Sequence, residues 1–587
     1  ESTGMIVVDQ VVPGGPATGI LEPGDVVVNL NGQKLGGFIE LESVLDDSVG
    51  ERIVMDIERG GEMRRVELGV GDLHAITPDR YLELGGGVLN PLSYHQARNH
   101  SIPVAGVYLA SPGYAFSRVG VPRGVIITHV GGVKVSDIEH FETEMAKYGD
   151  GEKVALQFHS PANPRAPGVL VMRADRNWFP MQLCRRNDET GRWPCVPSPS
   201  PRTVPAMEPA STDMAIQGGG DPVDAISASI VQVRYDVPFR LDGVHGDRFT
   251  GAGLVVDAEL GLVVVDRETV PIALGDLSII FGGSVEVPGK IAYLHPEHNF
   301  AVIRYDPALL GVTGVRTAKF SDVELKAGDR VWLVGITGGQ RIVSRETRVA
   351  RREPITMTQT FPPRFRERNI EAVTLDDVMP TVGGVLVDED ARVQALWASF
   401  SAGEGQMNDS FFAGLPVRQL RPVVERLRAG LDVGWRSLGV EFSALTISQA
   451  RGRGLSDAQA RRLEEADPEG RRVLVVRRLD AGAASAGSLR PGDLLLSVNG
   501  RPVTRHYQVE QAGMQEEVHL EVLRNGQELD LRVSTQSQEG KGTDRALLWA
   551  GTLLQDAPDV LAREYGIEPT GVYVARYWFG SPANRYG

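Results

Sequence analysis

The amino-acid sequence predicts a mainly β protein in which one strand-rich domain is flanked by copies of a small α+β module. Three observations predict this class: short apolar runs separated by turns, an internal repeat, and a high content of glycine and proline. The chain has 587 residues, with 68 glycines, 36 prolines and only 6% aromatic residues, a profile typical of turn-rich, strand-heavy proteins. This length has room for about four domains. With 42% hydrophobic and 23% charged residues, each domain can bury a core, and wholesale disorder is excluded.

A repeated motif marks the small module. LEPGDVVVNLNG at 21–32 recurs as LRPGDLLLSVNG at 489–500. Pro-Gly-Asp predicts a turn, and the run of Val or Leu before Asn-Gly predicts a buried strand. Each copy is followed by a second shared element, DIERGGEMRRVEL at 56–68 and EVLRNGQELDLRV at 521–533. Its central Arg-Gly-Gly or Arg-Asn-Gly predicts a tight hairpin between two alternating strands.

A fainter repeat adds two further copies. GVYLASPGYAFSRVG at 106–120 resembles GVYVARYWFGSPANRYG at 571–587. The first copy lacks the strand that should precede Met5, and the last copy stops at Gly587, so we interpret the sequence as an internal fragment of a longer chain. The four expected modules span 1–72, 73–180, 431–537 and 538–587.

The middle of the chain has a different pattern. Residues 181–223 are rich in proline, serine and glycine and are interpreted as a linker. From 224 to 430 the chain is a run of short apolar segments such as SIVQVRY, GLVVVD and RVWLVGI, and it ends in one helix at about Pro416–Arg428. Strands followed by a single C-terminal helix predict a β-barrel or sandwich domain.

Charge and composition limit the partners. The net charge of −15 argues against a broad nucleic-acid surface, and no apolar run approaches the roughly 18 residues of a membrane span. Cys184 and Cys195 are interpreted as free thiols, with one short disulfide loop as the alternative. Two Arg-rich segments, 341–352 and 362–368, are interpreted as solvated loops or, less simply, as partner surfaces.

The motifs together resemble those of the HtrA/Deg-type serine protease family. The repeated module is similar to the PDZ domain of that family. GAGLVVDAELGLVVVD, HPEHNFAVIRYDP, VGGVLVDEDARVQALW and FFAGLPVRQLRPVVERLRAG resemble parts of its trypsin-like double β-barrel. Two modules ahead of a diverged protease domain resemble the order of the double-length branch of fungi and plants. The resemblance implies a degenerate trypsin-like double β-barrel at 224–430, flanked by PDZ-like α+β modules.

The same resemblance locates the catalytic positions. A serine protease needs a nucleophile, a base and a carboxylate that orients the base. GLVVVDRETV places Glu268 where the family's GLILTNRHVV carries histidine, and NFAVI places Asn299 where DLAVL carries aspartate. PTVGGVLV places Val382 where GNSGGPLV carries the nucleophilic serine. Val382 has no nucleophilic atom and Asn299 has no charge, so the domain is predicted to have no catalytic residues.

The oxyanion loop is also affected. The family uses the backbone N–H two residues before the nucleophile to stabilise the oxyanion. That residue is Pro380 in this sequence, and proline has no N–H. Restoring a single residue is therefore not expected to restore the site.

Three alternatives compete with this interpretation. Thr381 with His295 or His298 would make a shifted nucleophile and base, but triads are defined by geometry. His295, Glu297 and His298 would offer metal ligands, but no second ligand cluster with zinc-like spacing accompanies them. GAGLVVD at 251–257 lacks the third glycine of a dinucleotide site and is interpreted as a strand. The sequence therefore predicts no metal and no cofactor.

The PDZ-like modules carry the candidate binding residues. A PDZ domain binds an extended peptide as an added strand, and a loop receives its terminal carboxylate. A helix beginning after Ser456, with Gln459 completing a capping box, is expected to form the other wall of the third module's groove. Alternatively, the apolar members of these loops are core residues that begin a strand. The candidate residues are Arg436, Ser437, Leu438, Gly439 and Val440 in the third module, Gly85, Gly86 and Gly87 in the second, and Ala550 and Gly551 in the fourth.

The expected function is a non-catalytic portion of an ATP-independent HtrA/Deg-like serine endopeptidase. It would bind peptide or unfolded-protein C-termini and scaffold or regulate an active protease domain upstream of residue 1. The alternative is a pure interaction scaffold or holdase whose parent contains no protease. The resemblance implies a homo-oligomer, trimeric in the family, and favours an intracellular compartment such as the nucleus or an organelle.

Overall fold

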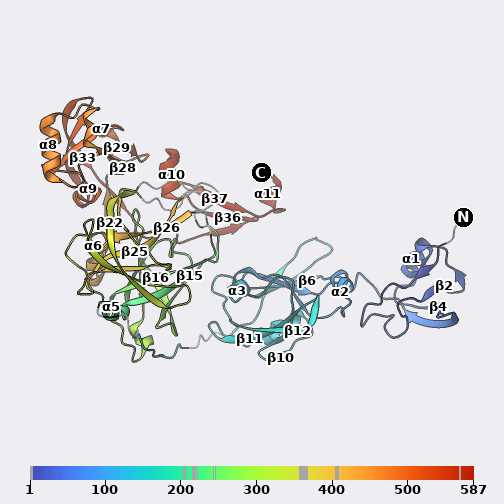
Figure 1. Ribbon diagram of the computed structural model, residues 1–587. Helices are drawn as coiled ribbons and strands as arrows, with labels where there is room; N and C mark the ends of the chain where they lie inside the picture. Colours follow the sequence, from blue (N-terminus) through green and yellow to red (C-terminus); the bar gives the residue numbers. More distant parts are fainter. Residues whose placement is uncertain are drawn as a thin grey trace. The chain divides into compact units, whose positions relative to one another are not determined.

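The computed structural model describes residues 4–201, 206–214, 220, 222–241, 244, 246–355, 368–402, 409–567 and 570–586. They fall into two compact units, Glu1–Met207 and Glu208–Gly587 (Figure 1). Strands predominate in both units, which confirms the predicted mainly β class. No helix in the described part of the chain is long and apolar enough to cross a bilayer.

The first module is a small antiparallel sheet with strand order β1-β2-β4-β5, and β3 lies beside β2. Ile53 and Ile57 of β4 are fully buried because alternate residues of a strand face the same side. Its elements are β1 (Ile6–Val7), β2 (Val26–Leu30), β3 (Gln33–Lys34), α1 (Phe38–Asp47), β4 (Arg52–Arg59) and β5 (Glu62–Gly69).

A buried ion pair explains why the two repeated motifs occur together. The Asp25 carboxylate accepts hydrogen bonds from Arg59 Nε and Nη2, both at 2.7 Å. Asp493 and Arg524 form the same two bonds, again at 2.7 Å. In both modules the aspartate ends the Pro-Gly-Asp turn and the arginine ends the first strand of the hairpin. The pair therefore joins the two motifs across the sheet.

Removing one partner of this pair is expected to destabilise the third module. The Asp493 side chain is 1% exposed and that of Arg524 is 19% exposed, so Asp493→Val leaves a partly buried guanidinium unpaired and should cost about 2 kcal/mol of unfolding free energy. The second module has Val125 and Ser160 at the corresponding strand positions. The double variant Asp493→Val/Arg524→Ser reproduces that combination and should recover part of the loss in urea unfolding. A double variant as unstable as the sum of both single variants would refute the pairing argument.

The second module is built on a nine-stranded sheet with the order β12-β11-β9-β8-β7-β6-β13-β14, and β10 pairs with β9. Helices α3 and α4 contribute Phe116 and Phe141 to its core. Its elements are β6 (Arg80–Leu84), β7 (Gly87–Pro91), α2 (Tyr94–His100), β8 (Val107–Ser111), α3 (Gly113–Arg118), β9 (Ile126–Val130), β10 (Val133–Lys134), α4 (Ile138–Met145), β11 (Lys153–Ser160), β12 (Asn163–Arg173), β13 (Gln182–Arg185) and β14 (Cys195–Pro197).

Strands β13 and β14 correct two predictions. The linker interpretation of 181–223 is wrong at its start, because β13 pairs with β6 and β14 pairs with β13. The free-thiol interpretation is also wrong: Cys184 and Cys195 lie opposite each other in this hairpin and form a disulfide. Proline within β14 is tolerated because it is an edge strand. The predicted linker also includes 202–205, 215–219 and 221, which lie outside the described residues.

Two closed six-stranded barrels follow, with strand orders β15-β16-β17-β20-β19-β18 and β21-β22-β23-β26-β25-β24 (Figure 1, green to yellow). The predicted C-terminal helix is confirmed as α6, whose Leu420, Val423 and Val424 are buried against the second barrel. The first barrel contains α5 (Val223–Ser227), β15 (Ile230–Asp236), β16 (Arg248–Asp257), β17 (Leu262–Val265), β18 (Asp276–Phe281), β19 (Val285–Leu294), β20 (Ala301–Tyr305) and η1 (Pro307–Leu310). The second contains β21 (Arg330–Ile336), β22 (Ile342–Ile355), β23 (Ile370–Leu375), β24 (Gly384–Val387), β25 (Val393–Ala402), β26 (Asp409–Pro416) and α6 (Val417–Arg428).

The third module has a six-stranded sheet with the order β28-β29-β30-β32-β33, in which β31 joins β30; β27 and β34 pair separately. The fourth region has the three-stranded order β35-β36-β37. The elements of the third are β27 (Trp435–Ser437), β28 (Val440–Thr446), α7 (Ile447–Arg451), α8 (Asp457–Ala466), β29 (Arg472–Leu479), η2 (Ala484–Gly487), β30 (Leu494–Val498), β31 (Arg501–Pro502), α9 (His506–Gly513), β32 (Glu517–Arg524), β33 (Gln527–Ser534) and β34 (Gln536–Gln538). Those of the fourth are β35 (Leu547–Trp549), β36 (Thr552–Asp556), α10 (Asp559–Tyr565), β37 (Val572–Tyr577) and α11 (Pro582–Tyr586).

Candidate functional site

Asn299, which the family motif places at the position of the catalytic aspartate, is held by hydrogen bonds to the backbone of both barrels. Asn299 is fully buried, and its Oδ1 accepts the backbone N–H groups of Arg267 at 2.9 Å and Glu268 at 3.3 Å. Its Nδ2 donates to the Ser399 carbonyl of the second barrel at 2.5 Å, and the Ser399 N–H donates to Asp266 Oδ2 at 3.0 Å. An amide can satisfy these backbone groups as well as a carboxylate can, but it provides no charge to stabilise an imidazolium.

The segment that the family motif predicts to be the oxyanion loop has no free N–H group at Pro380 or Val382. Pro380 has no N–H, and the Val382 N–H donates to the Ile336 carbonyl at 2.8 Å. The Gly383 carbonyl in turn accepts the Ile336 N–H at 3.1 Å, so the loop is bound to the end of β21 on both sides. Backbone donors that already have protein acceptors cannot stabilise a developing oxyanion.

The alternative pairing of Thr381 with a histidine has no support in this geometry. Thr381 Oγ1 is buried and, among the described residues, has no hydrogen-bond partner. His295 Nδ1 accepts the backbone N–H groups of Glu297 and His298 at 3.1 and 2.8 Å, and His298 Nε2 lies 3.2 Å from Glu510 Oε2. Both histidines therefore have other partners.

The three side chains weighed as metal ligands do not converge. The His295 ring packs against Trp435 with centroids 4.3 Å apart, whereas Glu297 faces Arg368 and His298 faces Glu510. In the described ranges, no group of three or more His, Cys, Asp or Glu side chains has the arrangement of a metal site.

The glycine loop of the second module is a tight turn. Gly85 and Gly86 have φ angles of +55° and +73°, as the two central residues of a type I′ hairpin turn require. The turn joins β6 to β7, and Gly87 is the first residue of β7. The Gly85 carbonyl accepts the N–H groups of Tyr114 and Ala115 from α3. Strand β6 thus occupies the edge of β7 on which a peptide would add, and a ligand would have to displace it.

The fourth region repeats this arrangement. Ala550 and Gly551 have φ angles of +49° and +76° and form the turn between β35 and β36, with Trp549 paired to Thr552. Strand β35 covers one edge of β36 and β37 covers the other. Here too the candidate loop is a hairpin turn.

The third module differs because the strand before its loop leaves the edge of β28 open. Strand β27 pairs with β34, and β28 pairs with β29 on one side; among the described residues, no strand pairs with its other edge. Leu438 and Val440 belong to the core of the module, which matches the structural alternative for those two side chains. Gly439 has φ +66°, and a Cβ there would lie 2.8 Å from the Ala483 Cβ, so glycine is required for this turn.

Two further members of that loop point to different partners. The Arg436 guanidinium donates to Thr535 Oγ1 and to the Thr535 carbonyl, both at 2.9 Å, so it fastens β27 beside β34. Ser437 Oγ accepts the Gly439 N–H at 3.1 Å. The Gly439 N–H thus already has an acceptor within the loop, and a peptide carboxylate would have to replace Ser437 Oγ there. The Arg436 side chain has a structural role.

The helix that faces β28 corrects another prediction. Helix α8 begins after the predicted capping residue Ser456, and the capping box with Gln459 is confirmed. However, α8 packs with Leu463 on a separate core cluster and does not line the groove. The wall opposite Val440 and Phe442 is α9, which provides His506, Val509, Glu510 and Gly513.

A charged network from the first barrel lies against this groove. Glu297 accepts hydrogen bonds from Arg368, from Trp435 Nε1 at 3.1 Å and from Gln538 Nε2 at 3.0 Å, and Arg368 Nη1 donates to Asp480 Oδ1 at 2.6 Å. Burial by itself would raise the pKa of Glu297, but the Arg368 guanidinium and the hydrogen bonds of Arg368 and Ser437 hold it at about 2. Glu297 is therefore ionised at neutral pH beside the candidate carboxylate loop.

Comparison with known proteins identifies the family of the chain. Residues 75–150 match the PDZ-like domain family and residues 7–59 match the PDZ domain family. All of this chain aligns at 33% identity with Protease Do-like 7 of Arabidopsis thaliana, over 65% of that protein. The chain belongs to the HtrA/Deg family of serine proteases with PDZ domains.

Fungal proteins of the HtrA/Deg family match over the same extent. The pro-apoptotic serine protease nma111 of Neosartorya fischeri is 34% identical over all of this chain and 58% of its own length, and that of Aspergillus fumigatus gives the same values. The chain thus spans about three fifths of the length of the curated relatives that it matches. A solved structure of the HtrA-type protease AlgW with a tripeptide matches 54% of this chain and 96% of its own, with 18% identity and a TM-score of 0.40.

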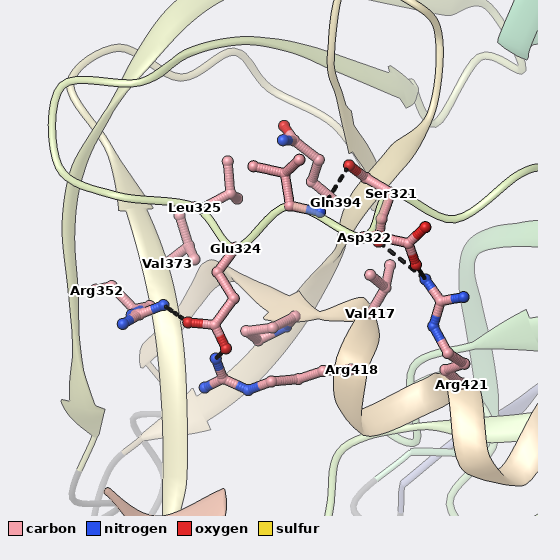
Figure 2. A pocket seen from close by; sticks show the side chains of 12 residues that line it. Ser321, Asp322, Glu324, Leu325, Arg352, Val373, Gln394, Val417, Arg418 and Arg421 are labelled. Carbon is pink, nitrogen blue, oxygen red and sulfur yellow. Dashed lines mark hydrogen bonds and ion pairs between the residues drawn. The ribbon is translucent and has the colours of Figure 1, made fainter. Parts of the chain in front are cut away.

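Within the barrel of this HtrA/Deg chain, a small cavity of about 180 Å³ lies beside α6 (Figure 2). Glu324 lies between Arg352 and Arg418 and accepts a hydrogen bond of 2.8 Å from each, and Arg421 pairs with Asp322 at 2.9 Å. Each of these arginines thus has an acidic partner, and the cavity is a structural feature of the barrel.

Arg352 comes from the Arg-rich segment 341–352, and the structure corrects the interpretation of that segment. It forms most of strand β22 and pairs with β21 and β23, so it is not a solvated loop. The second Arg-rich segment, 362–368, lies outside the described residues except for Arg368.

Sequence reasoning missed the residues that contact the groove from the barrel. Asn369, Arg368 and Glu371 lie just before or within β23 and carry no family motif. The available signal in the sequence was the polar run at the start of an apolar strand. The structure shows why it matters: Arg368, Asn369 and Glu371 are all buried, and buried polar side chains need partners.

Proposed function

We propose that this chain is a non-catalytic portion of an HtrA/Deg-type serine endopeptidase that takes part in protein quality control or regulatory proteolysis. It binds the C-terminal tails of peptides or unfolded proteins through the third module. It scaffolds or regulates a catalytic domain that belongs to the part of the relatives that this chain does not span. Assembly as a homo-oligomer, trimeric by resemblance, is part of the same proposal.

The observation that supports the non-catalytic part of this proposal is the residue types at the three motif positions: Glu268, Asn299 and Val382 cannot act as base, orienting carboxylate and nucleophile. Asn299 Oδ1 accepts the backbone N–H groups of Arg267 and Glu268, which supports a structural role for this side chain in the barrel. The nucleophile position has no reactive atom, and the oxyanion loop has no available N–H at Pro380 or Val382. This is consistent with a barrel that serves as a structural and binding element.

Restoring the nucleophile is expected to produce no activity. Val382→Ser, alone or with Glu268→His and Asn299→Asp, should hydrolyse casein no faster than the unaltered chain. Loss of one oxyanion donor costs about 10²–10³ in kcat, and both donors are missing. An active HtrA-type protease assayed in parallel provides the positive control. Turnover by Val382→Ser alone would refute this explanation of the inactive site.

The observation that supports peptide binding is that, among the described residues, no strand pairs with the outer edge of β28 beside the turn at Gly439. An extended peptide adds to such an edge through main-chain hydrogen bonds, while converging N–H groups receive its carboxylate. The second and fourth regions fill the equivalent edge with β6 and β35. The third module is therefore the candidate for ligand binding.

The test compares peptides as free acids and as C-terminal amides. Fluorescence anisotropy with a small peptide library should show binding of free acids and at least tenfold weaker binding of the matched amides. Gly439→Val should abolish binding, because its side chain would collide with Ala483. Gly430→Val is the control, since Gly430 also has a positive φ but a Cβ there meets no neighbouring atom within 4 Å. Equal binding of acids and amides would contradict carboxylate recognition.

A further inference from the structure

The groove of the third module already contains residues of the barrel domain. Asn369, which precedes β23 of the second barrel, lies against β28. Its Nδ2 donates to the Val440 carbonyl at 2.9 Å, and its Oδ1 accepts the Phe442 N–H at 2.9 Å. Val440 and Phe442 present these two groups on the edge of β28 that has no strand partner among the described residues. A side-chain amide has the same donor and acceptor as a peptide bond, so Asn369 satisfies groups that an added strand would use.

A second barrel residue lies beside the candidate carboxylate loop. The Glu297 carboxylate bonds to Trp435 of β27, and Ser437 also hydrogen-bonds to it. Arg368 joins Glu297 to Asp480 of the module. The side chains of Arg368 and Glu297 are each 4% exposed, so an anionic group of the chain itself is enclosed at this end of the groove.

The opposite wall of the groove is fastened to the barrels as well. The His506 N–H at the start of α9 donates to Glu371 Oε1 at 3.0 Å, and Glu510 lies 3.2 Å from His298. The cavity that remains among the groove residues is about 20 Å³, which is room for about one water molecule. No peptide side chain fits into this space while these contacts hold.

We propose that the barrel domain is the resident intramolecular occupant of the third module's groove, and that a peptide binds only by displacing it. This inference rests on the proposed peptide binding by the third module and specifies how that site is regulated. Asn369 occupies the strand edge, Glu297 and Arg368 close the carboxylate end, and Glu371 and His298 hold α9. Ligand binding and release of the module from the barrel are then one equilibrium.

Weakening the contacts of the occupant should lower the apparent dissociation constant of a peptide. When the binding-competent state is only a fraction of the population, the apparent dissociation constant rises by the inverse of that fraction. Asn369→Ala removes two hydrogen bonds that exist only in the occupied state, each worth about 0.5–1.5 kcal/mol. Loss of these bonds should strengthen the apparent affinity for a free-acid peptide about tenfold.

The experiment uses the whole chain and the tightest free-acid peptide of the library. Affinity is measured by fluorescence anisotropy for the unaltered chain, for Asn369→Ala, and for Asn163→Ala as a control at an exposed asparagine of β12. We expect about tenfold tighter binding by Asn369→Ala and no change for the control. Hydrogen exchange of the unaltered chain provides a second readout: saturating peptide should lower the protection of the His506 amide and keep that of the Phe442 amide.

Each outcome separates the two proposals. If the unaltered chain and Asn369→Ala bind the peptide equally and the His506 amide stays protected with peptide bound, the proposed peptide binding stands and the intramolecular occupant is overturned. If neither protein binds any free acid, peptide binding by the third module is overturned, and the inference falls with it. An Asn369→Ala protein that does not fold leaves the exchange measurement on the unaltered chain to decide.

Discussion

Replacing Arg368 by methionine is expected to lower the unfolding free energy of the Glu208–Gly587 unit by about 3–5 kcal/mol. The Arg368 side chain is 4% exposed and pairs with Glu297 and Asp480, whose side chains are 4% and 8% exposed. Methionine fills much of the same space but leaves two buried carboxylates without their cation. Urea unfolding followed by intrinsic fluorescence measures the loss, and the variant should also release the third module from the barrel.

The control for this prediction is an exposed pair with similar geometry. Arg330 and Glu346 form a two-bond contact at 2.7 and 2.9 Å, with side chains 53% and 51% exposed. Arg330→Met should cost much less unfolding free energy than Arg368→Met, because solvent screens an exposed pair. A loss for Arg368→Met no larger than that of the control would show that the buried network does not hold the two domains together.

The second large effect is a loss of stability on acidification, attributed to His506. Burial, reinforced by the neighbouring His298, lowers the pKa of His506 to about 4, and a hydrogen bond with the Phe442 backbone offsets only part of this shift. The unfolded chain therefore binds more protons than the folded chain between pH 6.5 and about 4. The contribution of His506 to the unfolding free energy therefore falls by about 3 kcal/mol in total as the pH is lowered through that window.

A matched variant isolates this contribution from those of its neighbours. The pKa of His298 is raised, because the Glu510 carboxylate outweighs the opposing effect of burial. Burial also raises the pKa of Glu371. Both groups therefore contribute stability at low pH that is lost as the pH rises. His506→Leu keeps the approximate size of the side chain and removes the titration. The unfolding free energy of the variant should fall less steeply than that of the unaltered chain between pH 6.5 and 4. Parallel pH profiles would contradict the assignment to His506.

Much of the fold could be predicted from the sequence because local patterns specify it. The Pro-Gly-Asp turn, the apolar strand and the Arg-Gly hairpin are contiguous signals, and the Asp25–Arg59 and Asp493–Arg524 pairs explain why they recur together. The helix at the end of the second barrel followed from the spacing of Leu420 and its apolar neighbours. The expected module boundaries stay predictions.

What could not be predicted depends on contacts between distant residues. Cys184 and Cys195 lie in a proline-rich stretch without periodicity. The pairing of β14 with β13, and of β13 with β6, places them in a sheet. The groove wall was assigned to α8 because that helix follows the loop in sequence, whereas α9, some 70 residues after Leu438, lies across from β28. The pairing of Asn369 with Val440 joins residues 71 positions apart, and no local pattern indicates it.

The catalytic positions show where motif comparison and structure provide different information. The sequence identified Glu268, Asn299 and Val382 as substitutions in three family motifs. The structure adds that Asn299 Oδ1 accepts the Arg267 and Glu268 N–H groups and that the Val382 N–H donates to the Ile336 carbonyl. Loss of reactivity is thus visible in sequence, while loss of the second oxyanion donor depends on a hydrogen bond that only coordinates reveal.

Covalent labelling of the unaltered chain by a fluorophosphonate probe tests the central claim, a protease barrel without catalytic function, most directly. An active HtrA-type protease treated in parallel shows that the probe is reactive, and mass spectrometry locates any adduct. We expect no adduct on any residue between 224 and 430. The contradicting result is a covalent adduct in that range, at Thr381 above all, that forms on the folded chain but does not form when the chain is heat-denatured before the probe is added. It would show that the barrel retains an activated nucleophile.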